Sequence, residues 1–326
     1  MGWPTGKTSP YAACSDTEFL DLVKVNGVRG AALKLGITER NAFKRRRTIE
    51  KRHNIVITPP TRGGHVQQLD NHEAAIQVGI QDGIILVGSD AHYWPGVLGV
   101  AHRAFIKFCQ MMNPKIVVMN GDAYDGARVS RWPDGSWTDM GAKPTVLQEL
   151  EATSAAMTEI ANASPGARHI FPLGNHDARF EMRLVQQVPE YAQVHGTRLK
   201  DHIKEWEPCW AVLVNDNTVI KHRFKAGIHA PHNNALWAGR SIVTGHLHSM
   251  KVMPLSDYNG TRWGVDCGCL ADPYGPQFFN YTELNPLNWR SGFAVLTFKN
   301  GKMLWPELVW ASGPDEVQFR GEVLRA

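Results

Sequence analysis

The sequence predicts a mixed α/β protein in which a layered α+β domain follows a small all-α domain. From residue 73 onward, short apolar runs rich in β-branched residues alternate with helical stretches, which is typical of sheet-and-helix layers. Residues 15–53 show only helical patterns, and the segment from Thr58 to Gly64 is rich in proline and glycine. We therefore predict a helical module at 1–57, a linker at 58–72 and a main domain at 73–326.

Composition indicates a folded cytoplasmic protein. At 326 residues and 43% hydrophobic content, the chain is long enough to bury a substantial core. No apolar run is long enough to span a bilayer, and the first ten residues lack the apolar core of a signal peptide. The five cysteines are odd in number and scattered, which does not indicate a disulfide framework. We expect no membrane partner.

The helical segment is predicted to contain three short helices. Ser15 begins a capping-box pattern, and Asn26-Gly27 predicts the end of the first helix. Gly36 predicts a tight turn after the second helix, and Thr38 can cap the third. This helix, turn and helix resemble a helix-turn-helix module.

Basic residues are concentrated in the same segment. Residues 1–60 carry eleven Lys/Arg and five Asp/Glu, a net charge of +6 in a chain whose total is +4. In helix-turn-helix modules the second helix of the motif enters the major groove of DNA. We therefore predict DNA as a partner, against the alternative of a helical cap with solvated charges. The predicted base contacts are Arg40, Asn41 and Lys44, and the predicted phosphate contacts are Arg45, Arg46, Arg47 and Lys51.

Apolar runs predict the strands of the main domain. Residues 74–80 and 84–88 flank a turn at 81–83 and are expected to pair as a hairpin. A second hairpin is expected around Asn300-Gly301, between 292–298 and 303–310. Further strands are predicted at 115–119, 169–173, 211–214, 219–221 and 241–244.

Potential metal ligands follow five of these runs. Because ligands gather at the carboxyl ends of strands in α/β sheets, we expect the five loops to meet at one edge. Imidazole together with carboxylate and amide oxygens favours Mn, Fe, Zn, Co or Ni over calcium. Gly121, Gly174 and Gly245 would let the backbone approach a metal closely. The loops are Ser89-Asp-Ala-His92, Asn120-Gly-Asp122, Gly174-Asn-His-Asp177, His222 and Gly245-His-Leu-His248.

This series, D-x-H, G-D, G-N-H-D, H and G-H-x-H, resembles the calcineurin-like metallophosphoesterase superfamily. Its combination with a helix-turn-helix-like module looks like the bacteriophage-encoded members, which would act in the cytoplasm of a bacterial host. The resemblance implies a two-sheet β-sandwich flanked by helices and two divalent transition-metal ions, with Mn²⁺ expected first. It also implies that Asp122 bridges the metals, that one is completed by Asp90, His92 and His248, and that the other is completed by Asn175, His222 and His246.

One ligand position has a rival. His222 follows a strand-like run, as the family's ligand does, but Arg223 stands where a glycine is usual. His229 lies in a Gly-Ile-His-Ala segment and is the alternative. We favour His222 because a strand end holds a ligand more rigidly than a loop does.

His176 resembles the family's general acid. It would protonate the leaving oxygen, while the metal centre activates a water for attack on phosphorus. Asp177 is the residue expected to orient His176. Both are therefore candidate catalytic residues rather than metal ligands.

A DNA-binding module joined to such a site predicts a metal-dependent DNA nuclease, conceivably a site-directed nicking endonuclease. Arg128, Arg131, Trp132 and Trp137 lie between two ligand loops and could hold phosphates and bases, or could belong to a surface loop. A phosphatase or cyclic-nucleotide phosphodiesterase is the alternative enzyme. A DNA-binding regulator with a vestigial catalytic domain is the alternative outside enzymes.

Overall fold

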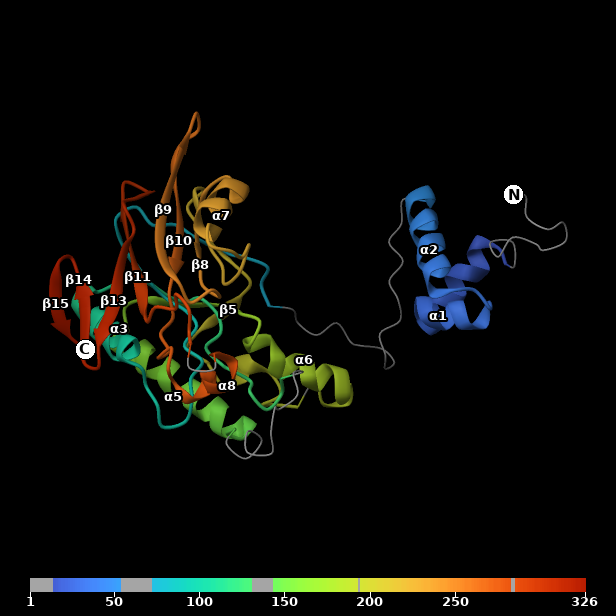
Figure 1. The fold of residues 1–326 in the computed structure, drawn as a ribbon, viewed down its shortest axis with the longest axis horizontal. Coiled ribbons are helices and arrows are strands. Elements are labelled where there is room, and N and C mark those ends of the chain that lie inside the picture. Colours follow the sequence, from blue (N-terminus) through green and yellow to red (C-terminus); the bar gives the residue numbers. More distant parts are fainter. Residues whose placement is uncertain (1–13, 54–71, 131–142, 193, 283–284) are drawn as a thin grey trace. The chain divides into compact units, whose positions relative to one another are not determined.

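A computed structural model describes residues 14–53, 72–130, 143–192, 194–282 and 285–326 (Figure 1). The chain divides into two compact units, Met1–Leu69 and Asp70–Ala326. Of the predicted linker at 58–72, only His72 lies within the described residues. No helix in these ranges is both long enough and apolar enough to cross a membrane.

The first unit contains helices α1 (Asp16–Lys34) and α2 (Glu39–His53). Ser15 caps α1 in a capping box, and α1 is broken at Gly27, whose φ is 69°. The helical segment is therefore in three pieces, as the sequence predicts. Gly36 has a φ of 62° in the turn, and the Thr38 hydroxyl accepts a hydrogen bond from the Asn41 amide at 3.2 Å. The helices bury Phe19, Val23, Val28, Ala31, Ala32, Ala42 and Ile49.

The second unit contains a nine-stranded sheet in which β2, β3, β4 and β5 run parallel. β11 pairs antiparallel with β2 and also with β12, which forms the predicted hairpin around Asn300-Gly301. In spatial order the strands are β15 (Glu322–Arg325), β14 (Glu316–Phe319), β13 (Glu307–Gly313), β11 (Gly292–Lys299), β2 (Gly83–Gly88), β3 (Ile116–Met119), β4 (Arg168–Pro172) and β5 (Glu207–Cys209), with β12 (Lys302–Met303) beside β11.

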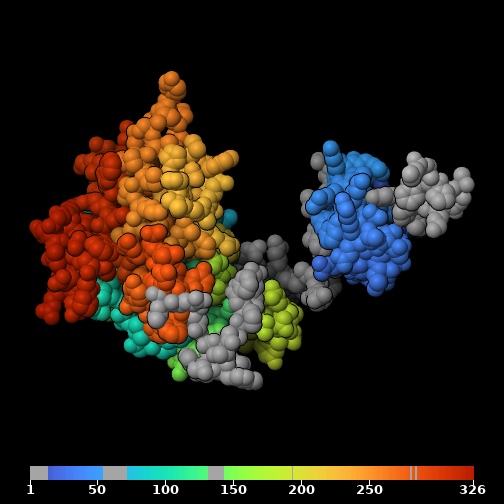
Figure 2. Space-filling model, in the orientation of Figure 1, coloured from blue at the N-terminus to red at the C-terminus, as the bar shows by residue number. Residues whose placement is uncertain are grey.

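A six-stranded sheet forms the second layer. Its edge strand β9 and the neighbouring β10 make a long hairpin that projects from the unit (Figure 2). In spatial order the strands are β1 (Ile76–Val78), β6 (Val212–Val214), β7 (Thr218–Ile220), β8 (Ser241–Thr244), β10 (Gly260–Cys267) and β9 (Met250–Asp257).

The predicted hairpin between 74–80 and 84–88 is wrong. β1 pairs in parallel with β6 in the six-stranded sheet, whereas β2 pairs with β3 and β11 in the other sheet. The turn at 81–83 therefore carries the chain from one layer to the next. The apolar pattern of a strand does not reveal which sheet the strand joins, because its apolar side chains would be buried equally well in either sheet.

The two sheets pack face to face, and helices cover both of their outer faces. Ile85 and Val87 of β2 join the core between the sheets, while Leu86 joins the core beneath the helices. α3 (Val100–Met112) and α5 (Val146–Ala163) lie on the nine-stranded sheet, and α7 (Ala230–Ala238) lies on the six-stranded sheet. The predicted two-sheet sandwich flanked by helices is confirmed. β2 is buried on both faces, which explains its uninterrupted apolar run.

The remaining elements are short or lie around the loops that follow the parallel strands. They are α6 (Asp177–Gln187), α8 (Phe279–Thr282), η1 (Pro189–Tyr191), η2 (Leu199–Asp201) and η3 (Pro276–Phe278).

Candidate metal centre

The predicted ligands follow strands of both sheets. Asp90, Asp122 and Asn175 come after β2, β3 and β4 of the nine-stranded sheet. His222 and His246 come after β7 and β8 of the six-stranded sheet. The expectation that five strand ends meet at one sheet edge is therefore corrected: two sheet edges lie side by side, and each contributes part of the site.

Five of the predicted ligands have left-handed backbone conformations. Among the described residues, the other non-glycine positions with positive φ are four asparagines and Arg320. A non-glycine residue in this region costs about 1–3 kcal/mol, and such residues gather where function requires a fixed geometry. The loops are therefore shaped by the site rather than by local preference. The five residues are Asp90 (φ 53°), His92 (φ 41°), Asp122 (φ 51°), His246 (φ 71°) and His248 (φ 54°).

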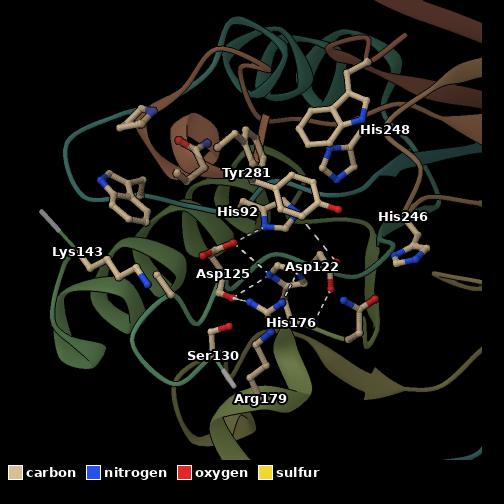
Figure 3. A pocket seen from close by; sticks show the side chains of 17 residues that line it. His92, Asp122, Asp125, Ser130, Lys143, His176, Arg179, His246, His248 and Tyr281 are labelled. Carbon is tan, nitrogen blue, oxygen red and sulfur yellow. Dashed lines mark hydrogen bonds and ion pairs between the residues drawn. The ribbon is translucent and has the colours of Figure 1, made fainter. Parts of the chain in front are cut away.

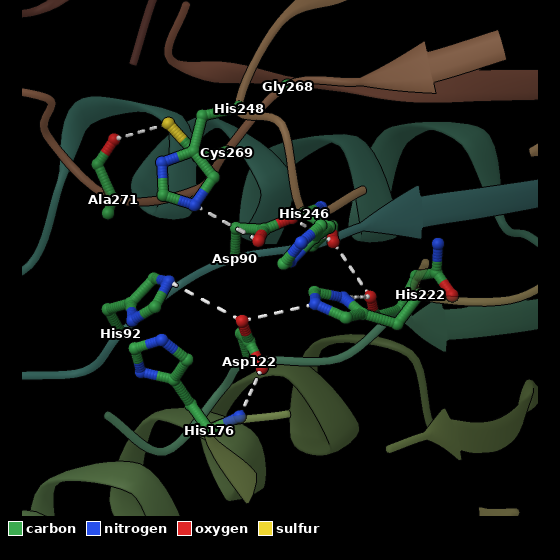
Figure 4. A network of polar contacts seen from close by, with 12 residues as sticks. Asp90, His92, Asp122, His176, His222, His246, His248, Gly268, Cys269 and Ala271 are labelled. Atoms are coloured by element: carbon green, nitrogen blue, oxygen red, sulfur yellow. Dashed lines mark hydrogen bonds and ion pairs between the residues drawn. The ribbon is translucent and has the colours of Figure 1, made fainter. Parts of the chain in front are cut away.

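Six predicted ligands form two groups. Within each group, one potential ligand atom from every residue lies within 4.8 Å of the others. Asp122 lies between the groups, because its Oδ2 atom is 3.1 Å from His222 Nε2 and 4.0 Å from His92 Nε2 (Figure 4). This is the position that a carboxylate shared by two cations would need. The groups are Asp90, His92 and His248, and Asp122, His222 and His246.

Buried polar atoms in this cluster lack hydrogen bonds. His92 Nε2 and Asn175 Oδ1 are inaccessible to water and have no hydrogen-bond partner within the described part of the chain. The same holds for His248 Nδ1. Asp90 Oδ1 and His222 Nε2 also make no hydrogen bond, but each lies 3.1 Å from an opposite charge, His248 Nε2 and Asp122 Oδ2 respectively. An unsatisfied buried polar group costs about 1–3 kcal/mol, so three in one place call for a missing partner. Cations bound by these atoms would satisfy them.

Hydrogen bonds on the far side of two histidines fix their orientation. His92 Nδ1 lies 2.7 Å from Asp125 Oδ1, and His222 Nδ1 lies 2.8 Å from the Asn120 carbonyl oxygen. In both rings Nδ1 therefore donates to an oxygen outside the cluster, and Nε2 is the nitrogen that faces the cluster. This is how proteins commonly prepare histidines for metal binding.

The electrostatics of the cluster favour positive charge. Burial raises the pKa of Asp122, but the nearby His222 and His176 rings outweigh it and hold that pKa well below its usual range. Burial lowers the pKa of His222, yet Asp122 and Asp90 raise it above its usual value. Both shifts have one cause, the attraction between buried carboxylates and the histidine rings beside them. Bound cations would supply the same compensating charge and leave the histidines neutral.

Comparison with solved structures gives weak likenesses. The structure is similar to Vps29 of Entamoeba histolytica, described as complexed with Zn²⁺, at 11% identity and a TM-score of 0.36, covering 74% of this chain and 98% of that one. It is also similar to a protein serine/threonine phosphatase of Saccharomyces cerevisiae with similarity to human PP5, at 12% identity and a TM-score of 0.35, covering 74% and 85%. No family model matches the chain, and neither does any curated protein.

The sandwich and the two ligand groups agree with the calcineurin-like metallophosphoesterase pattern. This agreement rests on the chain's own residues, from Asp90 to His248, and on their arrangement around Asp122. The helix-turn-helix-like unit and a bacteriophage origin stay predictions.

His176 lies beside the cluster and is oriented by Asp125. Its Nδ1 atom is 3.1 Å from Asp125 Oδ1 and 2.9 Å from the Asp125 carbonyl oxygen. Its Nε2 atom is 2.9 Å from Arg179 Nη2, and the Arg179 guanidinium also donates to the Asp125 carbonyl at 3.0 Å. One carboxylate, Asp125, therefore orients both His176 and the predicted ligand His92.

The predicted role of Asp177 needs correction. Its carboxylate accepts hydrogen bonds from the backbone amides of Asp122 and Gly174, each at 2.7 Å, and of Tyr124 at 3.0 Å. Asp177 begins helix α6, so its backbone fixes the side chain beneath the ligand loops. Burial, followed by the charge of Asp122, raises the pKa of Asp177 to about 7. Asp177 holds the loops together, and Asp125 orients His176.

Gly174 and Gly245 are required by close approach. A Cβ atom at Gly174 would collide with the Asp122 carboxylate, and one at Gly245 would collide with Ser89 and Asp90. Neither glycine has a positive φ. The predicted close approach of backbone to the site is present, and it allows the carboxylates of Asp90 and Asp122 to lie against neighbouring loops.

The structure brings His222 into the cluster and leaves His229 outside. His222 is 1% exposed, whereas His229 is exposed at the start of α7 and belongs to neither ligand group. We expect His222→Ala to lower metal content by about one ion per chain, because a three-residue group loses an imidazole. His229→Ala is the matched control and should retain both ions when the metal content is measured by mass spectrometry. The reverse order would transfer the ligand role to His229.

A cavity of about 580 Å³ opens over the cluster (Figure 3). His92, Asp122, His176 and His246 line its floor, and Arg179 and Lys143 also contact it. This volume is within the range of about 300–1,000 Å³ that small-molecule sites occupy. The predicted substrate residues Arg131, Trp132 and Trp137 lie outside the described residues. Arg128 donates to the carbonyl oxygens of Lys143 and Pro144, so it supports the loop instead of a substrate.

The predicted DNA contacts on α2 divide into two sets. Arg40, Lys44, Arg47 and Lys51 are exposed, Asn41 is half-buried, and the half-buried Arg46 pairs with Glu50 at 2.9 Å. Arg45 is only 5% exposed, and its guanidinium donates to the Cys14 carbonyl at 2.6 Å and to Asp16 at 3.3 Å, and lies over the Phe19 ring. The prediction that Arg45 contacts phosphate is therefore wrong. It is a core residue of the helical unit.

Proposed function

We propose that this chain is a two-metal phosphoesterase. The observation that carries the proposal is the pair of ligand groups with Asp122 between them, where buried polar atoms of His92, Asn175 and His248 lack hydrogen-bond partners. Three elements of the site serve a phosphate ester in particular: a shared carboxylate, a histidine beside it, and an arginine in the same cavity.

The residues fit divalent transition metals. Asp90, His92 and His248 would hold one ion, and Asn175, His222 and His246 the other, with Asp122 shared. We propose Mn²⁺, since mixed imidazole, carboxylate and amide ligands suit it; Fe, Zn, Co and Ni are the alternatives. When bound, two such ions neutralise the charge of a phosphoryl group and lower the pKa of a water.

The chain's own residues supply the proton and orient the substrate. His176 would donate a proton from Nε2 to the leaving oxygen, while its Nδ1 stays against Asp125. In the structure Nε2 instead faces the Arg179 guanidinium at 2.9 Å. Arg179 must therefore move away from His176 during the reaction, and a substrate phosphate in the same cavity is the anion that it would move to.

We further propose that the substrate is DNA and that the helical unit binds it. Four of the exposed basic residues of α2 are each three or four positions from the next, so they lie on one face of the helix and form a basic stripe. They are Arg40, Lys44, Arg47 and Lys51. Such a stripe suits a polyanion. The nuclease, and the nicking endonuclease in particular, stay proposals that depend on this stripe.

Substitutions of Arg45 and Arg47 distinguish effects on the stability of the helical unit from effects on its binding of DNA. Arg45→Ala is expected to lower the free energy of unfolding of this unit by about 1–3 kcal/mol, because it removes buried charged hydrogen bonds. Arg47→Ala should change that free energy by less than about 0.5 kcal/mol and should weaken DNA binding. Hydrogen exchange of the α1 and α2 amides and DNA titrations on the full chain measure the two effects. Stability loss in Arg47→Ala with none in Arg45→Ala would contradict the structural assignment.

The proposed function is tested with three substrates in parallel. The metal-free protein, and the protein with Mn²⁺, are incubated with bis(p-nitrophenyl) phosphate, with p-nitrophenyl phosphate and with supercoiled plasmid. We expect Mn²⁺-dependent hydrolysis of the diester and conversion of the plasmid to the nicked form. Hydrolysis of the monoester alone would favour the phosphatase. If none of the three substrates were hydrolysed while plasmid was bound, the DNA-binding regulator would replace the enzyme.

A further inference from the structure

Aromatic side chains form one wall of the cavity. Trp94, Phe278, Tyr281 and Trp289 line it together with the predicted ligand His248. The Trp289 ring packs against the His248 ring with centroids 4.1 Å apart. The Tyr281 ring stacks on Trp289 at 5.9 Å, with 26° between the ring planes. The rings therefore form a continuous run of contacts from the metal centre to the surface, edge-on between His248 and Trp289 and stacked between Trp289 and Tyr281.

Tyr281 ends this stack and is open to water. Although it stacks on Trp289, the Tyr281 side chain is 79% exposed. A large exposed ring at the mouth of a cavity contributes little to the stability of the fold, because most of its surface stays in water. It offers a flat face on which a ligand can stack. The outer end of the stack can therefore extend by one more planar group.

The cavity also favours anions. Lys143, Arg179 and Tyr281 surround the same space (Figure 3). Asp122 and Asp125 are the acidic residues among its described lining residues; Asp122 belongs to a ligand group, and Asp125 is held against His92 and His176. The rest of the lining combines two cationic side chains with aromatic rings, of which Tyr281 is exposed. A ligand that matches it carries both a phosphate and a planar ring.

We infer that this cavity binds an unpaired nucleotide of the substrate strand, with its base on Tyr281 and its phosphate at Arg179. The inference rests on the proposed function and specifies the substrate class. A base within a duplex has both faces covered by its neighbours, so it cannot stack on a protein ring until it is unpaired and turned out. The aromatic wall therefore selects single-stranded or locally opened nucleic acid over an intact duplex.

The test compares strands that differ only in their bases. A single-stranded oligonucleotide is compared with the same strand carrying abasic residues and with its duplex, each incubated with the Mn²⁺-loaded full chain. Base stacking on an aromatic residue contributes about 1–3 kcal/mol, so we expect kcat/KM to be about tenfold or more higher for the strand with bases. Tyr281→Leu should abolish this preference. Tyr258→Leu, at a fully exposed tyrosine of the β9–β10 turn, is the matched control and should keep it.

The possible results distinguish failure of the proposed function from failure of the inference about the nucleotide. Hydrolysis of bis(p-nitrophenyl) phosphate reports the proposed function by itself, so its absence would defeat that function and the inference with it. If the diester is hydrolysed but the oligonucleotide is not, or if Tyr281→Leu keeps the base preference, the inference alone is overturned. Faster cleavage of the duplex than of the single strand would contradict the inference that the bound nucleotide is unpaired. A phosphotyrosine peptide hydrolysed faster than the strand, with the same loss in Tyr281→Leu, would replace the nucleotide by an aryl phosphate.

Discussion

Asp122→Asn is expected to lower hydrolysis by about a thousandfold or more and to reduce bound metal. The Asp122 Oδ2 atom lies between His92 and His222, so one carboxylate serves both ligand groups. A neutral amide cannot bridge two cations, and metal ions contribute several kcal/mol to stabilising the transition state, at tenfold in rate per 1.4 kcal/mol. Turnover of bis(p-nitrophenyl) phosphate and metal content are the measurements.

The fold should survive this substitution, which makes the result interpretable. Asparagine has the shape of aspartate, and its Oδ1 can still accept the hydrogen bond that the His176 amide donates to Asp122 at 2.8 Å. Asp216→Asn, at an exposed position between β6 and β7, is the matched control and should behave as the unmodified protein. Near-normal turnover of Asp122→Asn with two bound ions would show that the shared-ligand assignment is incorrect.

Most of the strands, and the polar residues that the structure gathers in the cluster, could be located from the sequence because both leave local signals. β2 and β3 are apolar runs followed by polar loops, and a run buried on both faces must be apolar throughout. The polar residues that follow these runs therefore stood out. Which sheet each strand joins leaves no local signal, and for this reason the two edges of the site were taken for one.

The residues that orient the site could not be found in this way. Asp125 is separated by two residues from Asp122 and touches His92 and His176, which are distant in sequence. Asp177 neighbours His176 along the chain, but adjacent residues at the start of a helix point in different directions. The side chain of Asp177 instead accepts hydrogen bonds from the backbone amide of Asp122 in the loop after β3 and from that of Gly174 in its own loop.

Arg45 shows the same limit in the helical unit. Three identical arginines follow one another at 45–47, and residue type alone does not tell them apart. A helix turns by about 100° per residue, so they point in different directions. Arg45 therefore falls on the buried side with Ala42 and Ile49, while Arg47 falls on the exposed side. Helical periodicity measured from Ala42 and Ile49 would have identified Arg45 as a buried position.

His176→Ala is expected to lower the rate by about 10²–10⁴-fold while both metal ions stay bound. His176 lies close to His92 and Asp125 but is not one of the predicted ligands, and its assigned role is proton transfer to the leaving oxygen. The loss should be small for bis(p-nitrophenyl) phosphate, whose leaving group is acidic, and large for a dinucleotide, whose leaving alkoxide needs a proton. His195→Ala, at an exposed position, is the matched control.

Asp125→Asn completes this prediction, because Asp125 contacts both His176 and His92. Its carboxylate lies 3.1 Å from His176 Nδ1 and 2.7 Å from His92 Nδ1. Replacing it should lower the rate as His176→Ala does, and should also weaken metal binding by about 10–100-fold, as loss of a group that orients a ligand does. Rate profiles against leaving-group acidity and metal titrations of the two variants separate the effects. An equal loss for good and poor leaving groups in His176→Ala would remove His176 from proton transfer and leave Asp125 as a support of His92 alone.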